Sequence, residues 1–135
     1  MTNLNQQYKD AVELYNAGKH TIAINHLYKL ALLGHAWSLD AMGRLCENAL
    51  GDDRFWHRAA AFWYKQSAMH GDADAMYELS RLYHHGKGVR KDDKKALKWF
   101  LASAEHGGIN IDEETKQEIK RALDNDNLCS MELTI

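Results

Sequence analysis

Proline is absent from this chain of 135 residues and cysteine occurs only twice, and both shortages exclude classes of protein. Without proline, and with 45% hydrophobic and 27% charged residues, the composition excludes a collagen-like or disordered chain and favours an all-helical globule. Cys46 and Cys129 are too few and too far apart for a disulfide framework or a zinc cluster, whose ligands come in close pairs. We interpret both cysteines as reduced thiols.

The chain also lacks an excess of positive charge and a long apolar run. Its formal net charge is −2, so no overall positive field is present to hold a nucleic-acid backbone or an anionic membrane. The N-terminus lacks the basic start and apolar run of a signal peptide, and no stretch approaches the roughly 18 apolar residues that span a bilayer. We therefore expect a cytoplasmic protein that binds neither membrane nor nucleic acid.

An internal repeat is the strongest pattern that the sequence does contain. The segments 24–34, 61–71 and 97–107 align without a gap and end in glycines that are spaced 37 and 36 residues apart. An alanine lies eleven residues before each of these glycines, and a second alanine lies three residues before it. A period of this length is typical of stacked helical hairpins.

Downstream of the first two glycines, apolar residues recur at steps of three, which places them on one face of a helix. Each unit is therefore predicted to contain two helices, the first beginning near Trp37 or Asp74 and the second near His57 or Asp93. Trp63 and Trp99 occupy equivalent positions in the repeat, so we interpret them as core residues. The matching apolar residues are Leu39, Met42 and Leu45 in one unit and Met76, Leu79 and Leu82 in the next.

Three histidines, His70, His85 and His106, directly precede a glycine at a predicted helix end. Glycine adopts the left-handed conformation that ends many helices, and an imidazole in the last turn can bond a free carbonyl group. The alternative, a metal site, would need converging ligands, and these histidines belong to different helix ends. The Gly-Lys-Gly at 86–88 lacks the spacing and the preceding strand of a phosphate-binding loop.

The segment 75–107, AMYELSRLYHHGKGVRKDDKKALKWFLASAEHG, resembles the Sel-one-like repeat family, a branch of the tetratricopeptide (TPR-like) superfamily. It has the family's Ala-x-x-x-Leu, Tyr, Gly-x-Gly-Val, Asp, Lys-Ala, Trp-Phe and Ala-x-x-Gly positions in order. The preceding unit departs from this pattern with Cys46, Ala49 and one extra loop residue, and residues 11–31 resemble an ordinary tetratricopeptide unit. The resemblance implies an all-α fold, a right-handed α-α superhelix (solenoid) of about three to four helical hairpins.

We expect one domain over residues 1–135, with units at about 4–34, 35–71 and 72–107 and a closing helix and tail at 108–135. Residues 111–125 are predicted to form the closing helix, with acidic residues in its first turn and Lys120 and Arg121 in its last. The alternating apolar residues of the tail favour a short extended segment over the last helices.

In this superfamily the first helix of each unit lines a concave surface, which the resemblance implies for this chain as well. Large aromatic side chains and arginine carry most interface energy, so we expect this surface to bind another protein. In the alternative interpretation, this face is only solvated and does not bind a partner. Arg44 and Arg81 then pair with neighbouring acids such as Asp40, Asp74 or Glu78. Phe55 and Trp56 are predicted to lie in the loop before a second helix and to join the binding set. That set is Tyr8, Tyr15, Trp37, Asp40, Arg44, Glu47, Phe55, Trp56, Asp74, Tyr77, Arg81 and His84.

Signatures of catalysis are absent from the sequence, which lacks HExxH, GxSxG and CxxC motifs. We therefore expect that the protein is not an enzyme and that it has no catalytic residue, no bound metal and no cofactor. A nucleic-acid site would rest on six cations between Lys87 and Lys98, but Asp92 and Asp93 interrupt them, which favours a solvated loop. The sequence thus predicts a protein-binding module, monomeric alone, that serves as a toxin-neutralising immunity protein or inhibitor, or as an adaptor. The alternative is a metal- or nucleic-acid-binding regulator.

Overall fold

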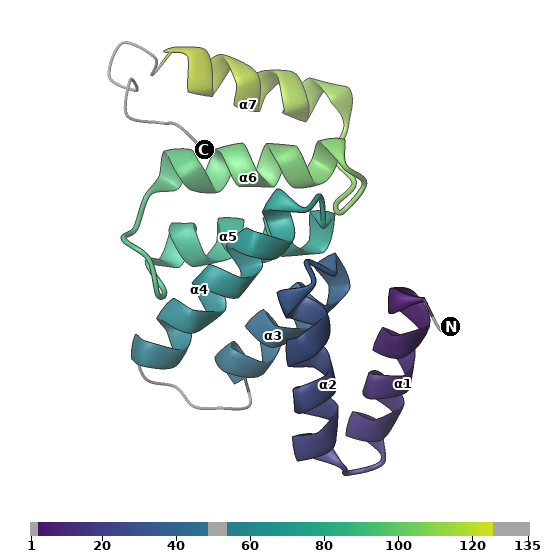
Figure 1. Ribbon diagram of the computed structural model, residues 1–135. Coiled ribbons are helices and arrows are strands. Elements are labelled where there is room, and N and C mark those ends of the chain that lie inside the picture. Colours follow the sequence, from purple (N-terminus) through teal and green to yellow (C-terminus); the bar gives the residue numbers. More distant parts are fainter. Residues whose placement is uncertain (1–2, 49–53, 126–135) are drawn as a thin grey trace.

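The computed structural model describes residues 3–48 and 54–125, and the regular structure in that part of the chain is entirely helical (Figure 1). Successive helices pair into hairpins, α1 with α2, α3 with α4 and α5 with α6, and the hairpins stack in chain order toward α7. The predicted all-α repeat superhelix is confirmed. The helices are α1 Leu4–Asn16, α2 His20–Leu32, α3 Ala36–Asn48, α4 Arg54–Met69, α5 Ala73–His85, α6 Asp93–Glu105 and α7 Glu113–Asn125.

Side-chain caps begin several helices. The carboxylate of Asp72 accepts a hydrogen bond of 2.9 Å from the backbone N–H of Asp74, and Asp92 accepts one of 3.1 Å from Lys94. Asp112 caps α7 through a bond of 2.7 Å from the N–H of Thr115. These caps satisfy backbone donors that have no partner within the helix, so the short polar residues set where the helices begin.

The His-Gly pairs end helices as predicted. Gly71, Gly86 and Gly107 all have positive φ angles, of 93°, 67° and 82°. The Nδ1 atoms of His70 and His106 lie 2.8 and 2.7 Å from carbonyl oxygens four residues earlier, so both imidazoles satisfy helix-end carbonyl groups.

The alanines of the repeat let the helices approach closely. Ala23 and Ala60 are fully buried and Ala96 is 5% exposed. Trp99 is buried as predicted, and the half-buried Trp63 packs against both core clusters, one formed mainly by α1 to α3 and one by α3 to α6. The core is therefore continuous along the stack.

Serine hydroxyls bond helices within single hairpins. Ser67 Oγ donates to the carbonyl oxygen of Ala36 at 2.7 Å, which joins α4 to the first turn of α3. Ser103 Oγ donates in the same way to Ala73 at 2.8 Å and joins α6 to α5. Both serines are fully buried, so these bonds form away from water.

Two expectations about helix limits are wrong. Helix α4 begins at Arg54, so Phe55 and Trp56 lie in its first turn and not in a loop. The reason is packing, because Trp56 is half-buried against the core cluster of α3 to α6. Helix α7 has Glu113 and Glu114 in its first turn as expected. Its last turn contains no basic residue, so the expectation that Lys120 and Arg121 lie there is wrong. Ala49, the extra loop residue and the tail with Cys129 lie outside the described residues.

Candidate functional site

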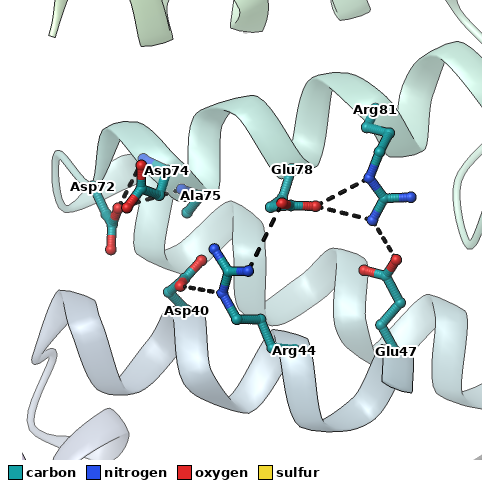
Figure 2. Close-up of polar contacts among 8 residues, drawn as sticks. All are labelled: Asp40, Arg44, Glu47, Asp72, Asp74, Ala75, Glu78 and Arg81. Atoms are coloured by element: carbon teal, nitrogen blue, oxygen red, sulfur yellow. Dashed lines mark hydrogen bonds and ion pairs between the residues drawn. The ribbon is translucent and has the colours of Figure 1, made fainter. Parts of the chain in front are cut away.

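An ion-pair network joins the first helices of two adjacent hairpins, α3 and α5 (Figure 2). Arg81 of α5 pairs with Glu47 of α3, and its Nη2 lies 2.9 Å from Glu78 Oε2. Arg44 of α3 donates from Nε to Asp40 Oδ2 at 2.8 Å, and its Nη1 lies 3.9 Å from Glu78 Oε1. The alternative in which these arginines pair with neighbouring acids is therefore observed, with Glu47 as an additional partner.

The acids of this network are more buried than the arginines. The side chain of Glu47 is 7% exposed and that of Asp40 is 13% exposed, against 47% for Arg44. Burial raises the pKa of Asp40 to about 6, although its hydrogen bond to Arg44 acts in the opposite direction. Burial acts to lower the pKa of Arg81, but its hydrogen bonds to Glu47 and Glu78 have the larger combined effect, so the pKa is raised.

Two buried carboxylate oxygens of the network carry unused acceptor capacity. Within the described part of the chain, Asp40 Oδ1 and Glu47 Oε2 have no hydrogen-bond partner. An unsatisfied buried acceptor is costly, so these two oxygens reduce the stability that the ion pairs contribute. The network is therefore a structural link between hairpins that holds two carboxylate oxygens without a donor.

Aromatic residues cluster where α1 meets α3. The ring centroids of Tyr8 and Trp37 lie 5.7 Å apart, and the His35 ring lies 5.7 Å from Tyr8 and 5.6 Å from Trp37. Trp37 is nevertheless 45% exposed, so much of its indole surface remains available for contact. Burial lowers the pKa of His35 and raises that of Tyr8. The cluster presents a large apolar ring beside the ion-pair network.

Tyr15 lies away from this cluster and stacks on His20, with ring centroids 4.3 Å apart. It lines a hollow of about 280 Å³ between α1 and α3, together with Val12 and Arg44. Arg44 therefore borders both this hollow and the ion-pair network.

A larger hollow of about 520 Å³ lies between α5 and α6. Three members of the predicted binding set, Tyr77, Arg81 and His84, line it, and Tyr77 is 39% exposed. Its second wall comes from α6 and was not predicted: it includes Asp93, Leu97 and Phe100. The repeat contains a signal for this second wall. Phe100 occupies the repeat position of Tyr64, and Tyr64 is buried by the hairpin that follows it.

The predicted set is thus only partly brought together. The face carried by α1, α3 and α5, which we call the first-helix face, contains the two hollows and the ion-pair network between them. Asp74 lies on the first turn of α5, at one end of this network (Figure 2). Phe55 is 67% exposed but belongs to α4, where its ring contacts Trp56 at 4.9 Å between centroids. Phe55 and Trp56 therefore do not join the first-helix face.

Neither a close group of metal-binding side chains nor a membrane-spanning helix occurs among the described residues. Across residues 3–48 and 54–125, no three His, Cys, Asp or Glu side chains gather closely enough to hold a metal ion. His84 instead lies beside Asp93, with Nδ1 3.0 Å from Oδ1, and Asp93 also binds Lys91. None of the helices in the same ranges combines the length and apolar character needed to cross a bilayer.

Comparison with known proteins finds similar repeats and a similar fold. The Sel1 repeat matches residues 41–72 and 73–108, about half of the chain. A stretch of 41 residues is 44% identical to the ERAD-associated E3 ubiquitin-protein ligase component HRD3A of Arabidopsis thaliana, covering 30% of this chain and 6% of that protein. The crystal structure of a Sel1 repeat protein from Oxalobacter formigenes is similar in fold, with a TM-score of 0.68, 23% identity, and coverage of 91% of this chain and 89% of that one.

Proposed function

Since the chain belongs to the Sel1 repeat family, a TPR-like family whose repeats generally mediate protein–protein interaction, we propose that it binds a partner protein along the first-helix face. The single observation that supports this location most strongly is the ion-pair network with a hollow on either side of it. Two hollows of about 280 and 520 Å³ fit individual side chains of a partner, while the network between them offers charged donors and acceptors.

The residue types on this face suit a protein partner. Trp37, Tyr77 and Arg44 are all more than a third exposed. Tryptophan, tyrosine and arginine dominate binding energy at protein interfaces, because they combine large apolar area with directed polar contacts. The helices that carry them are fixed by the core, so little ordering of the backbone would oppose binding.

Two roles fit a protein-binding module of this kind, and both remain proposals. An adaptor is favoured by the similarity to HRD3A, which is a component of a ubiquitin-protein ligase. A toxin-neutralising inhibitor, or immunity protein, would use the same rigid face to cover the active surface of one target. We propose that in either role the protein acts in the cytoplasm and is monomeric until it meets its partner.

Affinity capture from native lysate followed by mass spectrometry tests the binding face. We expect Trp37→Ala and Tyr77→Ala each to weaken capture of the partner about tenfold or more, because exposed aromatic side chains form binding hot spots and neither ring is part of an ion pair. Phe62→Ala is the matched control, since Phe62 is 56% exposed but lies on α4. Equal loss with all three variants would place the partner elsewhere.

Stoichiometry then separates the two roles. A single partner in a one-to-one complex, whose toxicity to growing cells the protein relieves, identifies an inhibitor. Several partners recovered in one assembly identify an adaptor. Arg81→Ala is a poor probe of binding, because its loss would leave the buried carboxylate of Glu47 without its partner and would lower stability as well.

A further inference from the structure

A polar hollow of about 390 Å³ forms where the loop after α5 lies against the beginning of α4. Arg54 and Arg58 of α4 line it on one side, and Gly86, Gly88, Val89 and Arg90 line it on the other. The three arginines come from chain segments about thirty residues apart, so no local sequence pattern reveals them as a group. We propose that this hollow is an anion site that binds a phosphoryl group.

The loop that carries Arg90 is held against α4 by its backbone. Gly88 has a φ of +75°, and a Cβ atom at this position would lie 2.1 Å from the carbonyl oxygen of His57. Val89 packs against the core cluster of α3 to α6. Because contact this close is open only to glycine, the loop is positioned before any ligand arrives, and Arg90 is held beside the first turns of α4.

Among the described residues that line this hollow, the charged side chains are all positive. Arg54 and Arg58 are separated by four residues, so they share one face of α4 as like charges. Arg54 is also the first residue of α4, where the helix dipole favours negative groups, and the first turn of α4 contains no acidic residue. By contrast, α5 and α6 each have an aspartate cap and an aspartate in the first turn. Among the ion pairs within residues 3–48 and 54–125, none involves these three arginines.

The arrangement matches a phosphoryl group in charge and in geometry. A guanidinium group offers paired N–H donors that fit the oxygens of phosphate, and a helix N-terminus adds backbone N–H groups to such a site. Three cations around one hollow suit a compact dianion, whereas an extended nucleic-acid backbone needs a charged groove. Free phosphate compounds and a phosphorylated serine or threonine of a protein both present this chemistry.

Calorimetric titration of the full chain, at constant ionic strength, tests the site with three probes: inorganic phosphate, pyrophosphate and a phosphoserine peptide. We expect saturable binding, weakened about tenfold by Arg58→Gln or by Arg90→Gln, because each removes a charge-assisted contact. Arg121→Gln, an exposed arginine of α7, is the matched control and should change affinity less than about twofold. Circular dichroism confirms that each variant is folded.

The pattern among the probes identifies the source of the phosphoryl group. Tight binding of the phosphoserine peptide, but not of its unphosphorylated form, indicates a modified protein, whereas equal binding of pyrophosphate indicates a free phosphate compound. The proposal is wrong if none of the three probes binds, or if Arg121→Gln weakens binding as much as Arg58→Gln. It is also wrong if phosphate binds only after Asp52 and Asp53, which directly precede α4, are both replaced by asparagine.

Discussion

At the scale of single residues, the ion pairs between α3 and α5 hold two carboxyl groups in mostly buried positions. Desolvation of a carboxylate costs free energy that its arginine partner recovers only in part, so such pairs add little net stability even though the loss of one partner is costly. The pairs join the first helices of two neighbouring hairpins. Asp40 is the member whose protonation should be measurable, because burial raises its pKa to about 6.

Replacement of Asp40 by asparagine tests this effect. The carboxyl group binds its proton more tightly in the folded state, and Asp72 and Asp74 add to the increase in its pKa. The resulting stabilisation is present at low pH and is lost as pH rises through the folded pKa. We expect the free energy of unfolding of the wild type, relative to Asp40→Asn, to fall by about 2 kcal/mol between pH 4 and pH 7. Urea denaturation over this range measures it, and parallel pH profiles would contradict it.

At the scale of elements, glycines and short polar caps decide where helices end and how loops lie. Gly34, Gly71 and Gly107 recur at each second helix's end with φ angles of 81°, 93° and 82°, so these ends could be predicted from the repeat. Gly88 serves a different purpose, since it permits a loop to touch the backbone of α4. A loop packed in this way makes the beginning of α4 part of the same rigid body as α5.

Gly88→Ala should therefore destabilise the protein far more than Gly18→Ala. Both glycines have positive φ, of 75° and 85°, but a Cβ at position 18 would meet no atom within 4 Å. We expect about 1 kcal/mol for Gly18→Ala from backbone strain alone, and about 3 kcal/mol or more for Gly88→Ala, because the loop must also move away from His57. Thermal denaturation compares the two variants, and equal losses would show that the close approach is unimportant.

At the scale of the whole molecule, stability depends on contacts between successive hairpins. In a stack of repeats each unit contacts only its neighbours. A unit at an end has one neighbour, so its unfolding breaks fewer contacts than the unfolding of a middle unit. Helix α7 is such a unit, because it packs against α6 and none of its residues is fully buried. The C-terminal end of the described stack is therefore its weakest part.

Amide hydrogen exchange should reveal this gradient. We expect the amides of α7 to exchange at least about tenfold faster than those of α3, α4 and α5, because opening α7 exposes little apolar surface while opening the middle hairpins exposes the continuous core. Mass spectrometry of proteolytic fragments resolves the helices. Uniform protection along the chain would indicate a single cooperative unit instead.

Most of the fold could be predicted from the sequence, because the helices and their ends are repeated and depend on local residues. The binding face could be predicted only in part. Arg81 and Glu47 were both expected on it, but their pairing depends on how one hairpin sits on the next. Phe100 and Arg58 were missed for a similar reason, since their surroundings come from distant segments. Phe55 and Trp56 were misplaced because their helix starts three residues earlier than the repeat alone indicates.

The buried hydroxyls of Ser67 and Ser103 have a mechanical consequence. Each one fastens the two helices of a single hairpin, whereas α4 and α5, which belong to neighbouring hairpins, pack through apolar side chains such as Tyr64, Ala75 and Met76. Hydrogen bonds resist sliding more strongly than apolar contacts do, because a small displacement breaks their geometry. The molecule should therefore flex between stiff pairs of helices, and the bond from Arg81 to Glu47 would act as a tether that limits how far the second and third pairs can swing apart.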